Sequence, residues 1–188
     1  MGRDKKFSEE DLWRVTQELI LDVGYDGFTM SLLSAKIGVS RAAIYKHYPN
    51  KEELIIQFML EKMEDSVTIL TGVDHTLSFE AQLEELIKRI FSMKELHQIL
   101  GHVSKVDSVT PIVASKKEQL LGMHHGLYEP LKRLILQGKK EALIAQDTND
   151  FLLLSFIFQT IEMPNHTGME NELFMQEIKK LLMYGITK

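Results

Sequence analysis

Basic side chains gather in one short window of the sequence. Residues 31–51 contain four bases, one histidine and no acid: Lys36, Arg41, Lys46, Lys51 and His47. Three more bases lie at the start of the chain, opposed only by Asp4: Arg3, Lys5 and Lys6. Ammonium and guanidinium groups bind phosphate, and an arginine fork can also read a guanine edge. The window therefore predicts a phosphate-binding surface, although a short run of one charge sign also arises by chance.

The rest of the chain is acidic. The whole sequence of 188 residues has 22 basic and 27 acidic side chains, which gives a net charge of −5. Residues 64–188 carry 13 bases against 17 acids. A general nucleic-acid binder would be basic throughout, whereas an acidic body with one basic face is typical of a protein that docks a single patch on DNA.

Other chemistries find little support in the residue types. The absence of cysteine excludes a disulfide framework, a thiol nucleophile and a thiolate metal site. Histidines that could hold a metal are His97, His102, His124 and His125. Adjacent residues on a helix diverge by about 100°, and a five-residue spacing aligns poorly too, so only a pairing across helices with Glu129 stays open. Because acid–base motifs, nucleophile motifs and glycine-rich phosphate loops are also missing, we expect no enzyme, no cofactor and no metal.

Composition favours a globular protein that does not enter the membrane. Apolar residues make up 44 % of the chain and charged residues 26 %, which suits a protein with a core. The first residues contain no apolar stretch of the kind that a signal peptide needs. The most apolar segment, Phe151–Phe158, is far shorter than the about 20 residues of a membrane span. We therefore expect a cytoplasmic protein.

Nearly every segment has the apolar spacing of a helix, so the predicted fold class is all-α, with about nine helices. In the first part of the chain, small polar residues mark the helix starts, and glycine or proline marks the ends. The predicted helices run from Ser8 to Gly24, from Thr29 to Gly38, from Ser40 to a point before Pro49, and over about 51–70.

The remainder of the chain follows the same pattern. Its predicted helices cover about 78–93, 94–105, 111–138, 148–163 and 171–184. Pro111 suits the first turn of the third of these. Pro130 predicts a kink within it, because proline cannot donate to the carbonyl of Gly126. Asp147 or Thr148 is the expected cap of the fourth.

Two of the short helices form a helix-turn-helix, because Gly38 permits a tight turn between them. The second helix would enter the major groove with its first residues leading. Arg41 can reach a guanine edge or a phosphate, and the two alanines after it allow close approach. The backbone of DNA lies within reach of Tyr45 and Lys46. The buried side of the motif is predicted to hold Leu33, Ile37, Ile44 and most of Tyr48.

This stretch resembles the TetR family of bacterial transcriptional regulators. The resemblance rests on the segments GYDGFT, IGVS and AAIYKHYPNKEEL within about the first 55 residues. It implies a three-helix DNA-binding domain over residues 1–52 and a helical effector-binding and dimerisation domain over 53–188. The residues expected to face DNA are Thr29, Ser31, Arg41, Ala42, Ala43, Tyr45, Lys46, His47 and Lys51, of which Lys51 would meet a phosphate.

The chain departs from the family pattern at two places. The family often has a threonine where this chain has the pair Ala42-Ala43, so a hydroxyl contact is absent. Ser31 stands where a basic residue is common. One phosphate anchor is therefore missing or is supplied by the bases at the start of the chain.

The helix that contains Phe151–Phe158 is apolar nearly all round, so it must be covered on more than one side. The last helix covers only one side, and a four-helix bundle of two copies would bury both. The predicted dimer contacts are Phe151, Leu154, Phe158, Phe174, Ile178 and Leu181. A core formed wholly within one chain is the alternative.

A kinked helix with small residues can open a cavity for an effector. The candidate lining residues are Met93, His97, Met123, Tyr128, Phe158 and Met163. With 10 methionines and 9 phenylalanines in the chain, an apolar or aromatic effector is expected, although such side chains are more often core.

The resemblance then implies a homodimeric regulator, usually a repressor, whose affinity for a pseudo-palindromic operator in double-stranded DNA responds to a small effector. The alternative is a DNA-bound adaptor whose C-terminal domain binds a protein partner in place of a small molecule.

Overall fold

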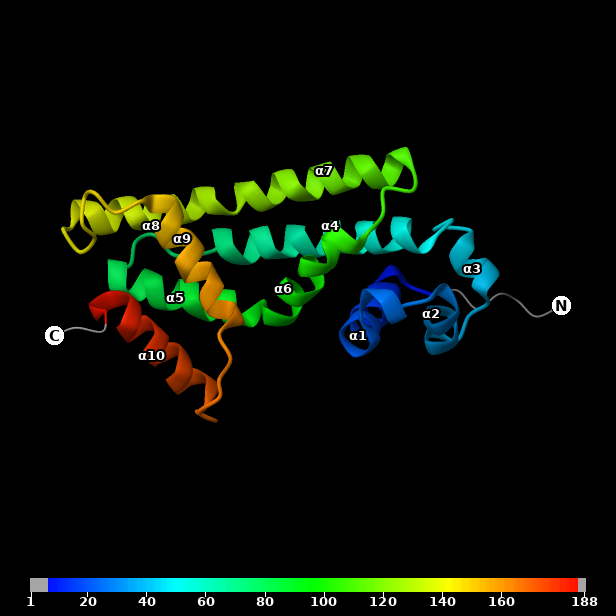
Figure 1. The fold of residues 1–188 in the computed structure, drawn as a ribbon, viewed down its shortest axis with the longest axis horizontal. Helices are drawn as coiled ribbons and strands as arrows, with labels where there is room; N and C mark the ends of the chain where they lie inside the picture. The colour runs from blue at the N-terminus through cyan, green and yellow to red at the C-terminus, as the bar shows by residue number, and fades with distance from the viewer. Residues whose placement is uncertain (1–6, 186–188) are drawn as a thin grey trace. The chain divides into compact units, whose positions relative to one another are not determined.

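The computed structural model describes residues 7–185, except for the side chains of residues 124–126, 129 and 130. Within that range the chain forms ten α-helices, two short 3-10 turns and no strand (Figure 1). The all-α prediction is confirmed, with one helix more than expected. No helix of the described residues is long and apolar enough to cross a membrane.

The chain divides into two compact units that interleave along the sequence. Unit 1 comprises Met1–Glu64 and Glu95–Met123, and unit 2 comprises Asp65–Lys94 and His124–Lys188. The chain passes between the units inside helices and not through a linker. The predicted division at residue 52 into two domains therefore stays a prediction.

Four helices open the chain, and their starts follow local hydrogen-bond chemistry. They are α1 (Glu9–Gly27), α2 (Met30–Ile37), α3 (Arg41–Tyr45) and α4 (Lys51–Thr71). The side-chain oxygens of Ser8, Thr29 and Ser40 each accept a hydrogen bond from the backbone N–H three residues later. Gly38 ends α2 with a φ of 80° in the left-handed region. The predicted caps are confirmed.

Gly24 breaks α1 without ending it. Its backbone has φ 70° and ψ 176°, which a residue with a side chain rarely adopts. The chain then makes one further turn, Tyr25–Gly27, before α2 begins. The predicted stop at Gly24 therefore marks the end of the regular helix, and a separate last turn follows it.

Aromatic and aliphatic side chains close the core of this first part. The Trp13 ring lies 5.8 Å from Tyr48 and 5.7 Å from Phe58, measured between ring centroids. Leu33 and Ile44 are fully buried, as predicted. Ile37 is only half-buried, so its assignment to the core is wrong. It is the last residue of α2, next to the exposed Gly38 turn, where helix packing ends on one side.

The remaining helices follow the predicted order. They are α5 (Phe79–Ser92), α6 (Lys94–Leu100), α7 (Pro111–Gly126), α8 (Tyr128–Lys140), α9 (Asp150–Gln159) and α10 (Asn171–Tyr184), with 3-10 turns η1 (Gly101–Lys105) and η2 (Thr160–Glu162). Ser78 caps α5, which lies within the predicted range 78–93, and α10 has the predicted bounds. The long helix divides at Leu127, one residue after Gly126, but Leu127 itself keeps helical angles, φ −61° and ψ −24°. The kink predicted at Pro130 therefore stays a prediction.

The cap of α9 differs from the prediction. Asn149, and neither Asp147 nor Thr148, accepts from the backbone N–H of Leu152, at 2.9 Å. The Lys139 ammonium explains the choice, because it bonds the carbonyl oxygen of Thr148 at 2.7 Å. With that carbonyl held by a lysine side chain, the helix begins one residue later.

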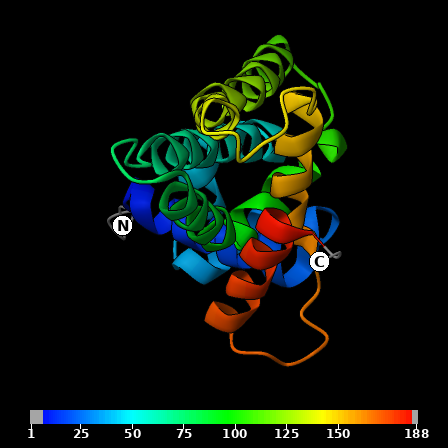
Figure 2. The ribbon, with the colours of Figure 1, turned by 90° about the vertical axis from the view of Figure 1, so that its left-hand side faces the viewer.

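In unit 2, α10 packs obliquely against α5 (Figures 1 and 2). The Lys179 ammonium on α10 pairs with two carboxylates of α5, Glu80 at 3.0 Å and Glu84 at 2.8 Å. The rings of Phe91 and Phe174 meet edge to face. The hydrogen bond from Lys179 is the largest cause that lowers the pKa of Glu84 from 4.5 to about 2.

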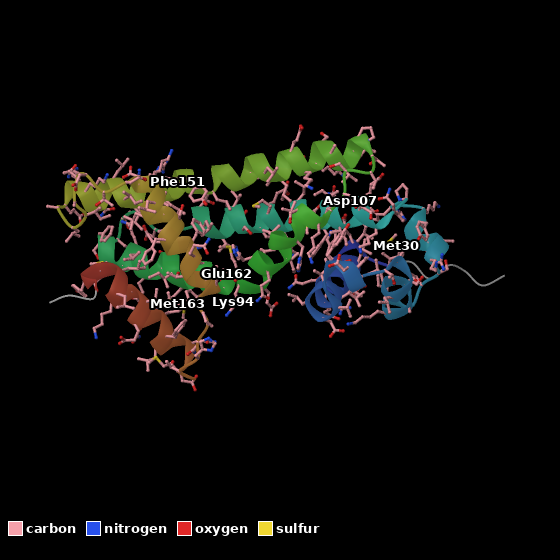
Figure 3. The ribbon with its side chains drawn as sticks, in the orientation of Figure 1. Met30, Lys94, Asp107, Phe151, Glu162 and Met163 are labelled. Carbon is pink, nitrogen blue, oxygen red and sulfur yellow. The ribbon has the colours of Figure 1, made fainter. Side chains whose placement is uncertain are left out.

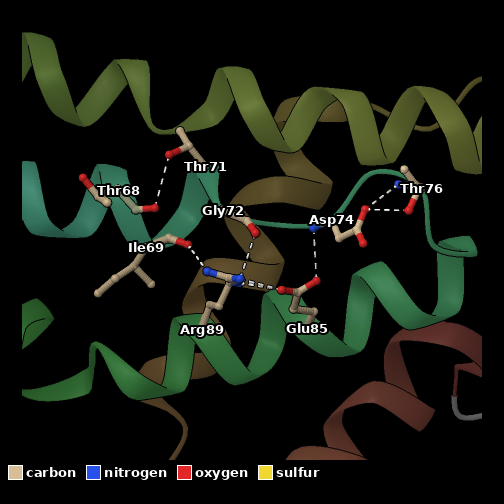
Figure 4. A network of polar contacts seen from close by, with 8 residues as sticks. All are labelled: Thr68, Ile69, Thr71, Gly72, Asp74, Thr76, Glu85 and Arg89. Carbon is tan, nitrogen blue, oxygen red and sulfur yellow. Dashed lines mark hydrogen bonds and ion pairs between the residues drawn. The ribbon is translucent and has the colours of Figure 1, made fainter.

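The end of α4 is tied to α5 by Arg89 (Figure 4). The guanidinium donates to the carbonyl oxygens of Ile69 at 2.7 Å and Gly72 at 2.8 Å, and its Nε donates to Glu85 at 3.0 Å. Glu85 in turn accepts from the backbone N–H of Asp74. The last carbonyls of a helix lack donors of their own and carry a partial negative charge. Arg89 therefore caps α4 from a neighbouring helix.

Candidate nucleic-acid interface

Helix α3 presents one face to solvent and the other to the core. Arg41, Ala42 and Tyr45 are exposed, and Ala43 is half-buried. Ile44 is fully buried and holds the helix on the core. Lys46 and His47, which follow directly, are exposed as well. The structure thus brings the predicted residues of the second helix together on one accessible surface.

Arg41 and Tyr45 form a pair on this surface. The guanidinium carbon lies 6.0 Å from the centroid of the tyrosine ring, at the outer limit of a cation–π contact. Residues four apart on a helix lie on the same side, so Tyr45 provides a flat surface along which Arg41 extends. An arginine held this way keeps its fork of donors free for a base edge or a phosphate.

The two predicted residues at the start of α2 differ in what their side chains do. The Thr29 hydroxyl accepts from the backbone N–H of Leu32 at 3.2 Å, so its cap role is shown. Ser31 is exposed, and its carbonyl oxygen accepts from the Ser34 hydroxyl. Both side chains remain predicted DNA contacts.

The Lys51 side chain lies against the last turn of α1. Its ammonium donates to the backbone carbonyl of Tyr25 and lies 4.0 Å from the centroid of the Tyr25 ring. Burial lowers the pKa of Lys51 and is the largest cause of its shift. The ammonium that is predicted to meet a phosphate therefore already has a partner in the free protein.

Acidic side chains of α1 reach one of the bases in the 31–51 window. Lys36 pairs with Glu18 at 3.1 Å, and Glu18 also accepts from Arg14 at 2.8 Å. These groups are exposed, so the pairs add little stability. They do remove Lys36 from the set of unengaged cations, which the sequence window alone did not show.

The segment that joins α3 to α4 is held from both sides. The Phe7 ring meets the His47 ring edge to face at 5.7 Å. Tyr48 is half-buried against Trp13, as predicted, and burial raises the pKa of its hydroxyl. Sequence reasoning missed Asn50, whose side-chain oxygen accepts from the backbone N–H of Glu53 at 2.7 Å. The signal was present, since asparagine followed three residues later by glutamate is typical of a helix start.

Two of the six effector candidates lie together in unit 2. The Tyr128 ring contacts Phe158 at 5.4 Å and Phe151 at 5.7 Å. Met93 is buried and Met163 is exposed. Figure 3 labels Met163 next to Glu162, the last residue of η2. The other two candidates, His97 and Met123, belong to unit 1. The effector site remains a prediction.

The predicted dimer contacts separate into exposed and buried residues. Phe151 on α9 and Leu181 on α10 are exposed, while Phe158 and Phe174 are half-buried. Leu154 and Ile178 are buried within the chain itself. Sequence reasoning missed exposed apolar residues on the same two helices: Leu152, Phe156 and Leu173.

Histidine chemistry adds nothing to this surface. His97 and His102 are half-buried, and the side chains of His124, His125 and Glu129 lie outside the described residues. Among the described residues, no group of three or more histidines and carboxylates could hold a metal ion.

A short helix with an exposed basic and aromatic face, set across a glycine turn from a second helix, defines a helix-turn-helix DNA-binding protein. Residues 12–58 match the family model described as bacterial regulatory proteins, tetR family. The fold agrees over nearly the whole chain with a bacterial regulatory protein in the tetR family from Rhodococcus RHA1, with a TM-score of 0.76, 14 % identity, and coverage of 96 % of this chain and 98 % of that one. Residues 12–58 thus carry a TetR-family DNA-binding domain, and the fold of the whole chain matches that of a TetR-family regulator.

Two further relatives are informative. The transcriptional regulator FadR from Bacillus subtilis, solved in complex with stearoyl-CoA, has a TM-score of 0.69 at 20 % identity and covers 96 % of this chain and 100 % of its own. The nucleoid occlusion factor SlmA of Serratia proteamaculans is 27 % identical over 138 residues, which is 71 % of this chain and 66 % of SlmA. The chain thus spans about two thirds of the length of this curated relative.

Proposed function

We propose that two copies of this chain bind a pseudo-palindromic operator and repress transcription from it. The observation that carries the proposal is the exposed face of α3, where Arg41, Tyr45 and Lys46 stand clear of a helix anchored by the buried Ile44. A regulator of bacterial genes acts where the chromosome is, so we place the protein in the cytoplasm. We assign it no catalytic step and no cofactor.

Each side chain on this face has a distinct task. Arg41 reads a base edge in the major groove, with guanine as the preferred partner of an arginine fork. Ala42 and Ala43 let the helix approach and offer methyl contacts. Tyr45, Lys46 and His47 meet the sugar–phosphate backbone and fix the register. Thr29 and Ser31 contact phosphates from the start of α2.

The apolar side chains on α9 and α10 support dimerisation. Phe151, Leu152 and Phe156 are exposed on α9, and Leu173 and Leu181 on α10. A twofold dimer buries the same patch of both copies. It presents two α3 helices to half-sites about 34–36 Å apart or a multiple of that spacing.

An effector then controls the affinity for DNA. The aromatic contact of Tyr128 with Phe158 supports an apolar or aromatic effector. The relative FadR, solved with stearoyl-CoA, is consistent with a molecule that carries an acyl chain. An effector that prefers the DNA-free state by about 100-fold supplies roughly 2.7 kcal/mol of coupling. An effector with equal affinity for both states would release nothing.

The similarity to SlmA favours a second candidate function. In that case the chain is a DNA-bound adaptor whose C-terminal helices recognise a protein in place of a small molecule. Thermal unfolding across a set of lipophilic compounds separates the two, because a ligand that binds only the native state raises the unfolding midpoint. A raised midpoint together with weaker operator binding supports the effector, and no shift across the set supports the adaptor.

Two variants test the division of roles on α3. Arg41→Ala should relax the preference at one base position, while Lys46→Ala should weaken binding to all sequences alike and flatten its salt dependence. Affinities for a duplex series with single base changes, measured at several salt concentrations, provide both readouts. Equal behaviour of the two variants would contradict the assignment.

A further inference from the structure

The last turn of α1 lacks a cation of its own. No basic residue lies in that turn, although the carbonyl groups at a helix end have no intrahelical donors and carry a partial negative charge. The carbonyl oxygen of Tyr25 accepts a long backbone hydrogen bond of 3.3 Å from Phe28. It also accepts from the Lys51 ammonium, which belongs to α4.

The position of Lys51 is unusual for a base. Lys51 is the first residue of α4, where the partial positive charge of a helix start disfavours a cation. Its side chain leaves that end and places the ammonium over the Tyr25 ring and beside the Tyr25 carbonyl. The charge therefore lies where the end of α1 stabilises it, and the ring adds a cation–π contact.

Asp26, the residue after Tyr25, is bound by a second cation. Asp26 accepts from the Lys105 ammonium of η1 at 2.8 Å, and this bond is the largest cause that lowers the pKa of Asp26. In unit 2, Arg89 caps the end of α4 from α5 in the same manner. Capping of one helix by a cation from another thus occurs at both α1 and α4.

We propose that Lys51 is a positioning residue: it caps α1 from α4, fixes the helix-turn-helix on α4, and makes no phosphate contact. The proposal rests on the DNA binding proposed above. It reassigns a lysine that the family resemblance places on a phosphate. Without the cap, the last turn of α1 opens and the helix-turn-helix takes up more arrangements on α4, of which only a fraction fits DNA. The apparent dissociation constant rises in inverse proportion to that fraction.

Salt dependence separates a positioning lysine from a phosphate-binding lysine. Removal of one phosphate-binding side chain lowers the slope of log K against log salt by about 0.9 for each protomer bound. The exposed Lys46 provides the matched control, since Lys46→Met and Lys51→Met remove the same charge and keep nearly the same length. Lys46→Met should flatten the slope, whereas Lys51→Met should weaken binding on the order of tenfold at every salt concentration and keep the wild-type slope.

Amide exchange provides a second readout that does not depend on DNA. The Phe28 N–H, which bonds the carbonyls of Gly24 and Tyr25, should exchange on the order of tenfold faster in Lys51→Met and at the wild-type rate in Lys46→Met. Both proteins are compared at a temperature where circular dichroism shows them fully folded. A flattened slope in Lys51→Met, or unchanged exchange at Phe28, overturns the proposal. If wild-type protein shows no salt-sensitive DNA binding, the proposed function fails, and the exchange experiment still decides the cap.

Discussion

Substitution of Phe156 by serine tests whether the exposed side of α9 joins two copies of the chain. Phe156 is 59 % exposed, in the same helix as Phe151 at 65 % and Leu152 at 69 %. A single exposed apolar side chain is common on a protein surface, whereas three large ones on one short helix form an apolar patch. Such patches mark contact sites. We expect Phe156 to be buried in a dimer.

The size of the effect follows from the exposed area. A phenylalanine buries roughly 150–250 Å² in all, so a 59 % exposed ring leaves roughly 90–150 Å² to be covered by a partner. At about 25 cal/mol per Å², this area contributes roughly 2–4 kcal/mol per copy, counted twice in a twofold dimer. Ordering costs on association offset part of it. A loss of about 2.7 kcal/mol, or 100-fold in the dimer dissociation constant, is therefore a lower expectation.

Sedimentation equilibrium of the wild type and two variants measures the effect. Phe156→Ser should raise the dimer dissociation constant at least about 100-fold. Leu136→Ser is the control, because Leu136 on α8 is exposed to the same degree, 60 %, and is outside the proposed interface. The reasoning is refuted if Phe156→Ser leaves the constant unchanged, or if Leu136→Ser weakens the dimer equally.

Three further predictions concern single positions. Gly138→Ala should lower the unfolding midpoint by several degrees in calorimetry, because a Cβ there would lie 2.6 Å from Ile144 and 2.7 Å from Phe79. Gly122→Ala is the control, since a Cβ at Gly122 would meet open space and should not lower the midpoint. Arg41→Ala should cost about 1–3 kcal/mol on the cognate operator and almost nothing on operators altered at the base it reads, which competition binding can measure. The bond from Lys179 lowers the pKa of Glu84 to about 2, so its stabilising contribution is complete above about pH 4.5 and disappears as the pH falls toward 2. An NMR titration should find the pKa of Glu84 raised in Lys179→Met, and an unchanged value would exclude the ion pair as its cause.

Local chemistry made much of the fold predictable. Ser8, Thr29 and Ser40 begin helices because their side-chain oxygens reach a backbone N–H three residues away, a contact that depends on almost nothing else. Gly38 acts through its own backbone in the same way, because it takes up the left-handed conformation that ends α2. The helix-turn-helix followed from these local signals, together with the bases that the sequence places around it.

The errors came from contacts between residues distant in the sequence. The start of α9 moved to Asn149 because Lys139 holds the carbonyl of Thr148. Apolar periodicity placed Leu154 and Ile178 on the apolar faces of their helices. It could not show which part of each face is buried by other residues of the same chain. Both are buried within the chain, while the exposed Leu152, Phe156 and Leu173 were left out of the predicted dimer contacts.

The same limit applies to the candidate site. The spacing of bases located the surface but could not show that Lys36 meets Glu18 and that Lys51 meets Tyr25, since these pairs form only in the folded chain. A sequence window counts charges, whereas the folded chain decides which charges remain unengaged.

Selection of bound duplexes from a random library tests the central claim most directly. Wild-type protein and an Arg41→Ala/Lys46→Ala variant are compared at physiological salt, because non-specific phosphate contacts dominate at low salt. A twofold-symmetric motif recovered with the wild type and absent with the variant is the predicted result. Salt-sensitive binding without any motif, or the same motif from both proteins, would contradict the assignment of α3 as the helix that reads DNA.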